Sequence, residues 1–249
     1  MDQTERSLQV TEQMQCSRCS VRVCTVDSSG KPLPGEPPPW CPMKTKADVI
    51  KRAMAKHTDE DRKIAHTAAR VESEAYLREP WGLKPYATRV LEIINFAKKM
   101  DYKKIGIACC FASGWDGRIL ANIFLNRGFD VIARFCKVYE VQNTKFLGLK
   151  EEETLVPGGF QSMCNPITQV ETLADSGCNL IVTFGECTGH DALAGKFSPV
   201  PLTVLGVKDR VLAHNPVVAL TCSWNQYYRK LTREEPLKIV YVNGHYRSY

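Results

Sequence analysis

The chain has 249 residues, of which 44% are apolar, enough for one large α/β domain or for one domain with a small appendage. Its net charge of +6 is modest for this length, and no block of Lys and Arg with interleaved aromatic residues predicts a nucleic-acid surface. No run approaches the roughly 18 apolar residues of a membrane-spanning helix, and the polar start of the chain does not resemble a signal peptide. We therefore expect a soluble, cytoplasmic protein that binds neither nucleic acid nor membrane.

The chain contains eleven cysteines, an unusual number for a protein of the cytoplasm. That compartment keeps thiols reduced, so clustered cysteines more often bind metal or take part in chemistry than form a disulfide framework. Cys178 and Cys222 each lie in an apolar stretch without a motif around them. We expect these two to be small buried side chains.

Two domains are predicted, a cysteine-containing metal-binding segment over residues 1–43 and an α/β domain over residues 44–249. Within the first, residues 30–39 are so rich in glycine and proline that they cannot form a helix or a central strand. Something other than secondary structure must hold this segment, and a metal ion would do so.

Three helices are predicted next. The pairs Thr45 and Asp48, and Thr58 and Asp61, have the spacing of a capping box, so each pair is expected to begin a helix. A third helix is predicted over residues 85–99. The side chains expected to face inward are Ile64, Ala68, Val71 and Ala75 in the second helix and Tyr86, Val90, Ile93 and Ala97 in the third.

From residue 104 onward, strands and helices alternate. The apolar runs that predict buried strands lie at residues 105–109, 131–135, 180–184 and 202–207. The helices predicted between them lie at about residues 115–127, at 166–176 and near Asp191. This alternation predicts an α/β fold with a doubly wound, mostly parallel sheet and helices on both faces. The loop of roughly thirty residues after the second strand is long for a compact domain and is therefore a functional candidate. A final strand is predicted at residues 238–242.

Four cysteines near the N-terminus have the spacing Cys16-x2-Cys19-x4-Cys24-x16-Cys41, and Pro42 follows. A Cys-x2-Cys pair lets two thiolates reach one ion from a single turn, and four thiolates suit tetrahedral zinc or an iron–sulfur cluster. The gaps and the final Cys-Pro slightly favour iron–sulfur, because ordinary zinc ribbons use two Cys-x2-Cys pairs. A metal is expected here, and its identity stays open.

Four further cysteines are predicted to lie along one edge of the sheet. Cys110 and Cys136 end the first and second strands, and Cys187 follows the third. In a parallel sheet these carboxyl ends share one edge, where open α/β folds bind ligands. Cys164 directly precedes a predicted helix that has Asn165 as its N-cap, and a helix N-terminus favours the thiolate form.

These thiols allow two interpretations. They could ligate a second metal ion or cluster, or Cys164 or Cys187 could be nucleophilic or redox-active, with His190 as base and Asp191 orienting it. Thr188 and Asp191 also have capping-box spacing, so Asp191 could serve only to cap a helix. Each cysteine alone could equally be a small core residue. Four of them at one edge favour a site.

Charged residues follow the fourth strand at the same edge. Residues 208–210, Lys-Asp-Arg, and residues 214–216, His-Asn-Pro, could meet an anionic substrate or could form a salt-bridged loop. No glycine-rich phosphate-binding motif follows any strand, so nucleotide binding is not predicted.

With these motifs the chain resembles the prokaryotic family of unknown function numbered eighteen forty-seven, whose members are described only as metal-binding proteins. The resemblance covers roughly residues 16–221. It rests on the N-terminal cysteines with Cys41-Pro42, on residues 104–110, on Cys136-Lys137, on residues 163–166, on residues 187–191 and on residues 207–216. It implies a cysteine-ligated metal and a small α/β domain, and it implies no known reaction. The positions that match the family are Cys110, Cys136, Cys164, Cys187, His190 and Asp191. The chain departs from the pattern at Cys109, at Phe111–Gly117 and beyond residue 222, where the aromatic and basic tail is expected to be an edge strand and a solvated end.

Three functions follow, in order of preference. The first is an iron–sulfur protein with one cluster at each cysteine group, which transfers electrons to a redox partner protein or performs a redox or sulfur-handling reaction on a small molecule. The second is a non-enzymatic protein with structural zinc, whose α/β domain binds a ligand or partner. The third is an enzyme with a thiol nucleophile.

Overall fold

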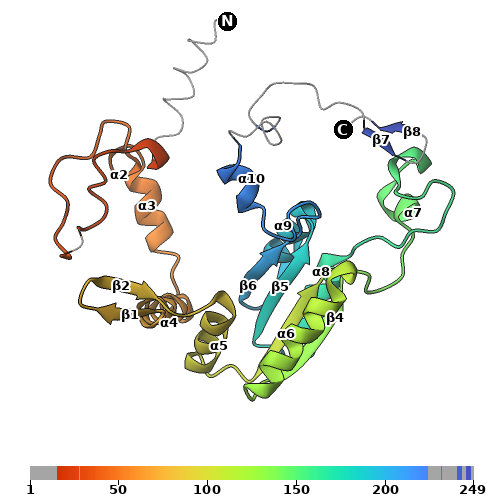
Figure 1. Ribbon diagram of the computed structural model, residues 1–249, viewed down its shortest axis with the longest axis horizontal. Helices are drawn as coiled ribbons and strands as arrows, with labels where there is room; N and C mark the ends of the chain where they lie inside the picture. The colour runs from red at the N-terminus through yellow and green to blue at the C-terminus, as the bar shows by residue number, and fades with distance from the viewer. Residues whose placement is uncertain (1–15, 28, 224–230, 232–239, 243–244, 248–249) are drawn as a thin grey trace, which may run out of the picture. The chain divides into compact units, whose positions relative to one another are not determined.

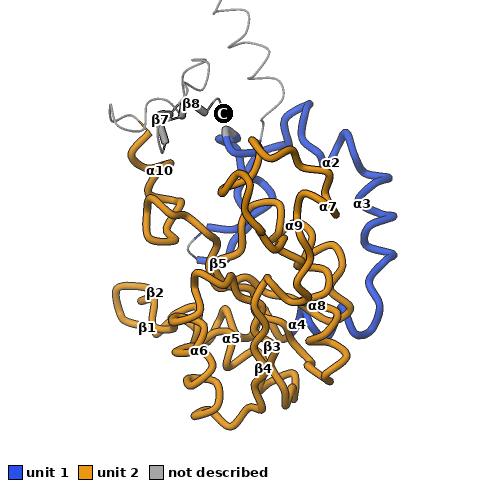
Figure 2. The backbone as a smooth tube through the Cα atoms, turned by 90° about the vertical axis from the view of Figure 1, so that its right-hand side faces the viewer, with its two compact units in different colours: residues 1–66 blue, residues 67–249 orange. Residues whose placement is uncertain are grey.

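The computed structural model describes residues 16–27, 29–223, 231, 240–242 and 245–247 (Figure 1). The chain divides into two compact units, Met1–His66 and Thr67–Tyr249, and the division falls within one helix, α4 (Asp59–Glu74) (Figure 2). The boundary predicted after residue 43 lies inside the first unit and stays a prediction.

The first unit has little regular structure and no core of its own in the part described. Its elements are η1 (Cys16–Arg18), α2 (Pro42–Thr45), α3 (Ala47–Met54) and the first half of α4. A β-bridge joins Val26 to Pro32 at the start of the glycine- and proline-rich segment. None of the residues between 16 and 66 whose exposure is described is buried, so side-chain packing does not account for the path of this segment.

One of the two predicted capping boxes is present. At the start of α4, the Asp61 carboxylate accepts a hydrogen bond from the Thr58 backbone N–H at 2.9 Å, and the Thr58 hydroxyl accepts one from the Asp61 N–H at 3.1 Å. The prediction at Thr45 was wrong. Thr45 ends α2, where its hydroxyl donates to the Cys41 carbonyl, and Lys46 occupies the N-cap of α3.

A hairpin separates α4 from the next helix, and the sequence analysis missed it. Strands β1 (Tyr76–Glu79) and β2 (Gly82–Pro85) pair antiparallel around a tight turn. Helix α5 (Arg89–Lys99) therefore begins later than predicted, with Thr88 as its N-cap. Tyr86 lies before the helix and is 62% exposed, contrary to the prediction, whereas Ile93 and Ala97 are buried as expected.

The second unit is built on a four-stranded sheet in which every pair of neighbouring strands is parallel (Figure 1). Its order is β4-β3-β5-β6, formed by β3 (Lys104–Cys109), β4 (Asp130–Phe135), β5 (Leu180–Glu186) and β6 (Leu202–Val207). The connecting helices are α6 (Gly114–Asn126), α8 (Pro166–Asp175) and α9 (Thr188–Phe197). The predicted α/β fold with a parallel sheet is thus confirmed.

Helices cover both faces of this sheet. On one face, residues of α5 and α6 pack with alternate residues of the central strands, such as Ile105 and Ile107. On the other face, α8 and α9 pack against the intervening residues, such as Ala108 and Ile181. Gly106 lets α8 approach closely, because a Cβ there would lie 3.2 Å from Leu173. Alternation of the two clusters along each strand is the reason that the strands read as continuous apolar runs.

The long connection after β4 contains short helical elements. It contains α7 (Asn143–Leu147) and η3 (Glu151–Glu153), and a β-bridge joins Gln142 to Ser162 near its ends. After β6 come α10 (Val217–Thr221) and the antiparallel pair β7 (Val240–Val242) and β8 (His245–Arg247), which forms a sheet of its own. Residues 238 and 239 of the last predicted strand lie outside the described residues.

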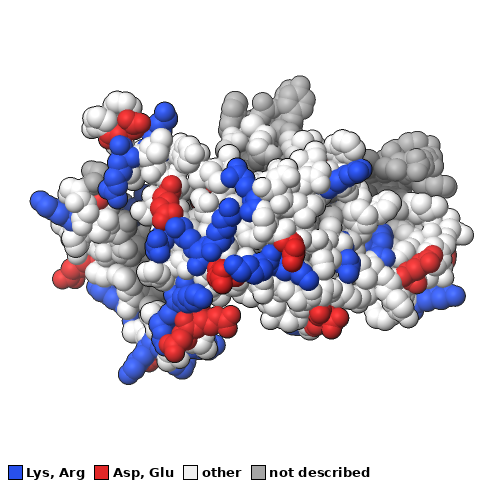
Figure 3. Space-filling model, turned by 90° about the horizontal axis from the view of Figure 1, so that it is seen from below, with Lys and Arg blue, Asp and Glu red and all other residues white. Residues whose placement is uncertain are grey.

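Among the described residues, no helix combines the length and apolar character needed to cross a bilayer. On the face shown in Figure 3, Lys and Arg side chains are interspersed with Asp and Glu.

Candidate functional site

The ends of three neighbouring strands place cysteines at one edge of the sheet, as predicted. Cys110 directly follows β3 and is the N-cap of η2 (Phe111–Ser113), Cys136 directly follows β4, and Cys187 follows β5 and is the N-cap of α9. Cys164 lies two residues before α8, whose N-cap is Asn165. Cys178 is buried as predicted, in the core with residues of α8, whereas Cys222, at the C-cap of α10, is only half-buried, contrary to the prediction.

Backbone hydrogen bonds join these strand ends to one another. The Cys110 N–H donates to the Phe184 carbonyl at 3.1 Å, and the Cys136 N–H donates to the Cys109 carbonyl at 3.0 Å. The Asn165 N–H donates to the Cys136 carbonyl at 2.7 Å, which brings the residue before α8 next to the end of β4. Cys136 and Cys164, 28 positions apart in the sequence, are neighbours for this reason.

Cys164, Cys136 and His190 form the centre of the site. A hydrogen bond from the Cys136 thiol, and then one from the His190 ring, lower the pKa of Cys164, and the positive charge of Lys137 acts in the same direction. Conversely, the hydrogen bond to Cys164 and burial raise the pKa of Cys136. The hydrogen bond to Cys164 also raises the pKa of His190. These shifts favour the thiolate form of Cys164, the protonated ring of His190 and the thiol form of Cys136.

A buried carboxyl, that of Glu186, lies near Cys164 and His190. Glu186, the last residue of β5, is 1% exposed, and burial raises its pKa to about 7 even though Gln169 donates a hydrogen bond to it at 3.3 Å. The same amide nitrogen of Gln169 donates to the carbonyls of Cys109 at 3.1 Å and Arg134 at 2.8 Å. Gln169 therefore ties the ends of β3, β4 and β5 together.

Two cations contact the other two thiols. The Lys208 ammonium donates to the Cys110 sulfur, and a guanidinium nitrogen of Arg210 donates to the Cys187 sulfur at 3.3 Å. Burial lowers the pKa of Lys208, but its hydrogen bond to Cys110 and its electrostatic interaction with Cys110 and Cys187 outweigh burial and raise the pKa overall. The sequence allowed residues 208–210 to form a salt-bridged loop. In the structure, Lys208 and Arg210 contact thiols instead.

A tightly folded loop holds these two cations. The Asp209 carboxylate accepts hydrogen bonds from the N–H groups of Val211 and Leu212 at 2.9 and 2.8 Å, and the Asp209 N–H donates to the His214 ring at 3.1 Å. Ala213 and His214 both have positive φ, which is costly for residues other than glycine and is common at functional sites. The carboxylate of Asp209 thus shapes the loop.

Several buried polar atoms at this edge have no hydrogen-bond partner, although such atoms are nearly always paired in folded proteins. They are Ser113 Oγ, Gln169 Oε1, Glu186 Oε2, His190 Nδ1 and Asp191 Oδ1. Asp191 does not cap α9, because Cys187 is the N-cap and helix α9 already begins at Thr188. Burial raises the pKa of the Asp191 carboxyl. This clustering of unsatisfied polar atoms is typical of an active or binding site.

The N-terminal cysteines are less enclosed. Cys16 and Cys24 are exposed, whereas Cys19 and Cys41 are half-buried. The Cys16-x2-Cys19 pair forms a single turn, as the spacing predicted, and the Arg22 backbone N–H donates to the Cys19 sulfur at 3.5 Å. Within the described residues, no three or more His, Cys, Asp or Glu side chains are grouped in a way that could hold a metal ion. The metal predicted here and the cluster predicted at the sheet edge both stay predictions.

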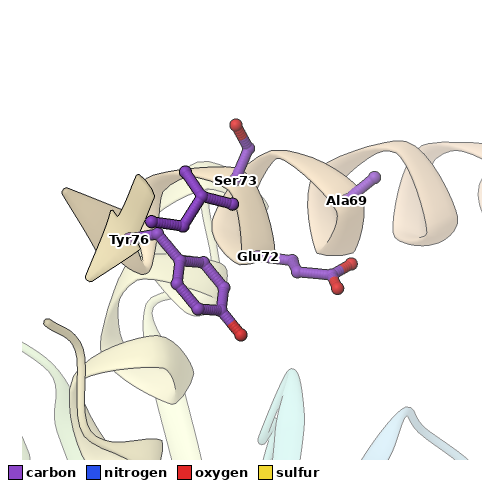
Figure 4. A pocket seen from close by; sticks show the side chains of 5 residues that line it. Ala69, Glu72, Ser73 and Tyr76 are labelled. Atoms are coloured by element: carbon purple, nitrogen blue, oxygen red, sulfur yellow. The ribbon is translucent and has the colours of Figure 1, made fainter. Parts of the chain in front are cut away.

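A separate hollow of about 240 Å³ lies between α4 and the β1–β2 hairpin (Figure 4). It is lined by Ala69, Glu72, Ser73, Tyr76 and Leu83, and Figure 4 shows the first three along α4 with Tyr76 at its end. It contains no thiol or imidazole, so the carboxyl edge of the sheet is the stronger candidate for chemistry.

Glu186 and Gln169 were not predicted as site residues from the sequence. The available signal was a carboxylate at the end of an otherwise apolar strand, since such a strand end in a parallel sheet is buried by the helix that follows. Nothing in the sequence marked Gln169, because its role depends on three partners that are distant along the chain.

Comparison with known proteins agrees with the resemblance stated above. Residues 41–205 match the model of the family described as "Protein of unknown function (DUF1847)". The "Uncharacterized protein MJ0455" of Methanocaldococcus jannaschii is 35% identical over 218 residues, which cover 87% of this chain and 97% of that protein. The matched region includes Cys41 and all the cysteines of the sheet edge. The chain belongs to this family of unknown function.

Proposed function

We propose that the carboxyl edge of the sheet is a thiol-redox centre that exchanges electrons with a substrate by thiol–disulfide exchange. Cys164 is the attacking thiolate, Cys136 is the second thiol of the pair, and His190 holds and moves the proton. The observation that carries this proposal is the backbone hydrogen bond from Asn165 to the Cys136 carbonyl, which makes Cys136 a neighbour of Cys164, together with the hydrogen bonds of Cys136 and His190 to the Cys164 sulfur.

Cys164 is better placed for attack than Cys136. Cys164 is half-buried, so part of the residue is open to solvent, whereas Cys136 is 1% exposed. Thiolates, not thiols, are nucleophiles, and low-pKa cysteines beside cationic groups are typical of disulfide oxidoreductases. The buried Cys136 can then reach only its neighbour, which suits a resolving thiol.

The exchange takes place in two steps. The Cys164 thiolate attacks one sulfur of a substrate disulfide, a mixed disulfide forms, and the departing substrate thiolate takes the proton of the His190 imidazolium. Cys136 then gives its proton to the neutral His190 ring and attacks the Cys164 sulfur. The second substrate thiolate leaves, and a Cys136–Cys164 disulfide remains. Two electrons pass from the protein dithiol to the substrate, and a dithiol reductant restores the protein by the reverse exchange.

The test is alkylation of anaerobically purified protein with iodoacetamide at pH 6.5, with each modified cysteine identified by peptide mass analysis. Cys164 is expected to react at least about tenfold faster than the half-buried Cys222, because only thiolates react. In a series of glutathione redox buffers, non-reducing peptide maps should reveal a Cys136–Cys164 disulfide, absent from the Cys164→Ser variant and present in the Cys222→Ser control. The proposal would be refuted if Cys164 and Cys222 reacted equally fast and no Cys136–Cys164 disulfide formed in any of the glutathione buffers.

We propose in addition that Cys16, Cys19, Cys24 and Cys41 bind one structural metal ion or cluster. The supporting observation is that no residue between 16 and 66 whose exposure is described is buried, so this segment has no core to fold around. The donor set fits zinc or an iron–sulfur cluster. When bound, the metal would fix the turn at Cys16 and the return of the chain at Cys41.

Metal and acid-labile sulfide analysis of anaerobically purified protein tests this second proposal. The Cys16→Ser/Cys19→Ser double variant should lose the metal, whereas Cys178→Ser should retain it. Iron together with sulfide indicates a cluster, and zinc alone indicates a structural ion. Equal metal content in the two variants would contradict the assignment.

A further inference from the structure

We infer that the substrate of the thiol centre carries an anionic group, such as a carboxylate or phosphate, and that Lys208 and Arg210 bind it. This inference rests on the proposed function, since it names the substrate class of the same site. The geometry that supports it is the placement of two cations, with unused donors, directly against two of the four thiols.

The two cations lie at the edge of the reactive pair. Cys187, which Arg210 contacts, is the N-cap of α9, and its carbonyl accepts hydrogen bonds from the N–H groups of His190 at 2.8 Å and Asp191 at 2.9 Å. Cys110, which Lys208 contacts, is followed by Phe111, whose backbone N–H forms a hydrogen bond with the Cys136 thiol. A group bound by Lys208 and Arg210 would therefore lie about one turn of α9 from His190 and one residue along the chain from the N–H group that contacts the Cys136 thiol.

Both cations have hydrogen-bonding capacity to spare. Guanidinium has five N–H donors and ammonium has three, and the described contacts use one donor of Arg210 and one of Lys208. In the part of the chain that the structure describes, no Asp or Glu forms a salt bridge with either of them. Arg210 is exposed, so an incoming ligand can reach it from solvent. Guanidinium binds carboxylate and phosphate through paired hydrogen bonds.

The loop between β6 and α10 keeps both cations in place. The Asp209 carboxylate accepts hydrogen bonds from the N–H groups of Val211 and Leu212. Among the described residues, it therefore forms no ion pair with either of the neighbouring cations. The same loop contains two consecutive residues with positive φ, Ala213 and His214, a backbone conformation that is energetically unfavourable for residues other than glycine. An acidic residue in this position would be expected to neutralise the cations, but here it is used to shape the loop.

A pair of reagents that differ in charge tests the inference. Iodoacetate is an anion, iodoacetamide is neutral, and both alkylate thiolates with the same leaving group. The measured quantity is the ratio of the iodoacetate rate to the iodoacetamide rate at each cysteine of the full-length protein at pH 7, followed by peptide mass analysis. The ratio cancels any change in thiolate content, because both reagents need the thiolate.

We expect the iodoacetate-to-iodoacetamide rate ratio at Cys164 and Cys187 to fall about fivefold in the Arg210→Gln variant. A similar fall is expected in the separate Lys208→Gln variant, since each change removes one nearby positive charge. Arg210→Lys should retain most of the ratio. Lys196→Gln is the matched control, because it removes one positive charge from the exposed last turn of α9, and its ratio should equal that of the wild type.

The outcomes separate the two proposals. Equal slowing by both reagents in the Arg210 and Lys208 variants would mean that the cations only stabilise thiolates, and the inference would be overturned. Slow reaction of Cys164 with both reagents in the wild type would refute the thiol-redox proposal. The inference would still be decided by the ratio at Cys187.

Discussion

Replacement of Glu186 by glutamine is expected to make the protein more stable at alkaline pH. Burial raises the pKa of Glu186 from its ordinary value of 4.5 to about 7, so the folded protein holds this proton more tightly than the unfolded chain. The stabilisation is complete below pH 4.5 and is lost as the pH rises through about 7. At 1.36 kcal/mol per pH unit, the difference between the two pKa values corresponds to a loss of about 3 kcal/mol.

Glutamine keeps the shape of the side chain and its oxygen can still accept the hydrogen bond from Gln169, but it cannot ionise. We therefore expect the free energy of unfolding of Glu186→Gln to be within about 1 kcal/mol of wild type at pH 5 and about 3 kcal/mol higher at pH 8. The measurement is urea-induced unfolding followed by circular dichroism at both pH values. Glu152→Gln, at an exposed position of η3, is the matched control and should follow the wild type. A parallel loss of stability with pH in wild type and Glu186→Gln would show that the buried carboxyl is ionised without penalty.

Three further substitutions probe other features. His190→Ala should slow the alkylation of Cys164 by iodoacetamide at pH 6.5 about tenfold, because it removes a charge-assisted hydrogen bond to the thiolate; an unchanged rate would exclude this pairing. Gly185→Ala should destabilise the fold by at least about 2 kcal/mol in urea unfolding, because φ at Gly185 is +67° and a Cβ there would clash with the Ser113 hydroxyl. Gly189→Ala is the control: nothing lies close to a Cβ at this position, so the free energy of unfolding should change by less than about 1 kcal/mol. Cys178→Ser should lower the free energy of unfolding by about 1 to 3 kcal/mol by burying a hydroxyl, with no change in metal content; loss of metal would contradict its assignment to the core.

The central sheet could be predicted from the sequence because its strands are buried on both faces. The run at residues 105–109 alternates between two cores, so every position is apolar, and the same holds for most of β5. Once the strands are recognised as parallel, their carboxyl ends fall on one edge. The positions of Cys110, Cys136 and Cys187 follow from this alone.

Other local features could not be predicted because tertiary contacts decide them. Residues 76–85 contain Pro80, Trp81 and Gly82, which disfavour a helix, but the pairing of the flanking residues into a hairpin carries no strong pattern of its own. At Thr45, the spacing to Asp48 is correct for a capping box, but the short helix α2 already uses Thr45 as its last residue. Spacing motifs of four residues predict local structure only when no neighbouring element competes for them.

The chemistry of the site could be predicted only in part. Cys164, His190 and the cations after β6 could be recognised as candidates, but the sequence did not indicate which of them are in contact. The pairing of Lys208 with Cys110 joins residues 98 positions apart, and no periodicity encodes such a contact. Glu186 lies where the pairing between β5 and β6 is irregular, and its hydrogen bond comes from Gln169, 17 positions earlier in the chain.

The amide of Gln169 has a consequence for the way this region opens. One nitrogen with two protons serves the carbonyls of Cys109 and Arg134 and the carboxyl of Glu186, so no single strand end can separate without disturbing the other two. Opening should therefore be cooperative, and the backbone amide protons of Cys110 and Cys136 should exchange with solvent deuterium together and slowly. A site held in this way is already assembled before a ligand arrives, so its rate of reaction should be set by encounter and chemistry and not by closure of the chain around the ligand.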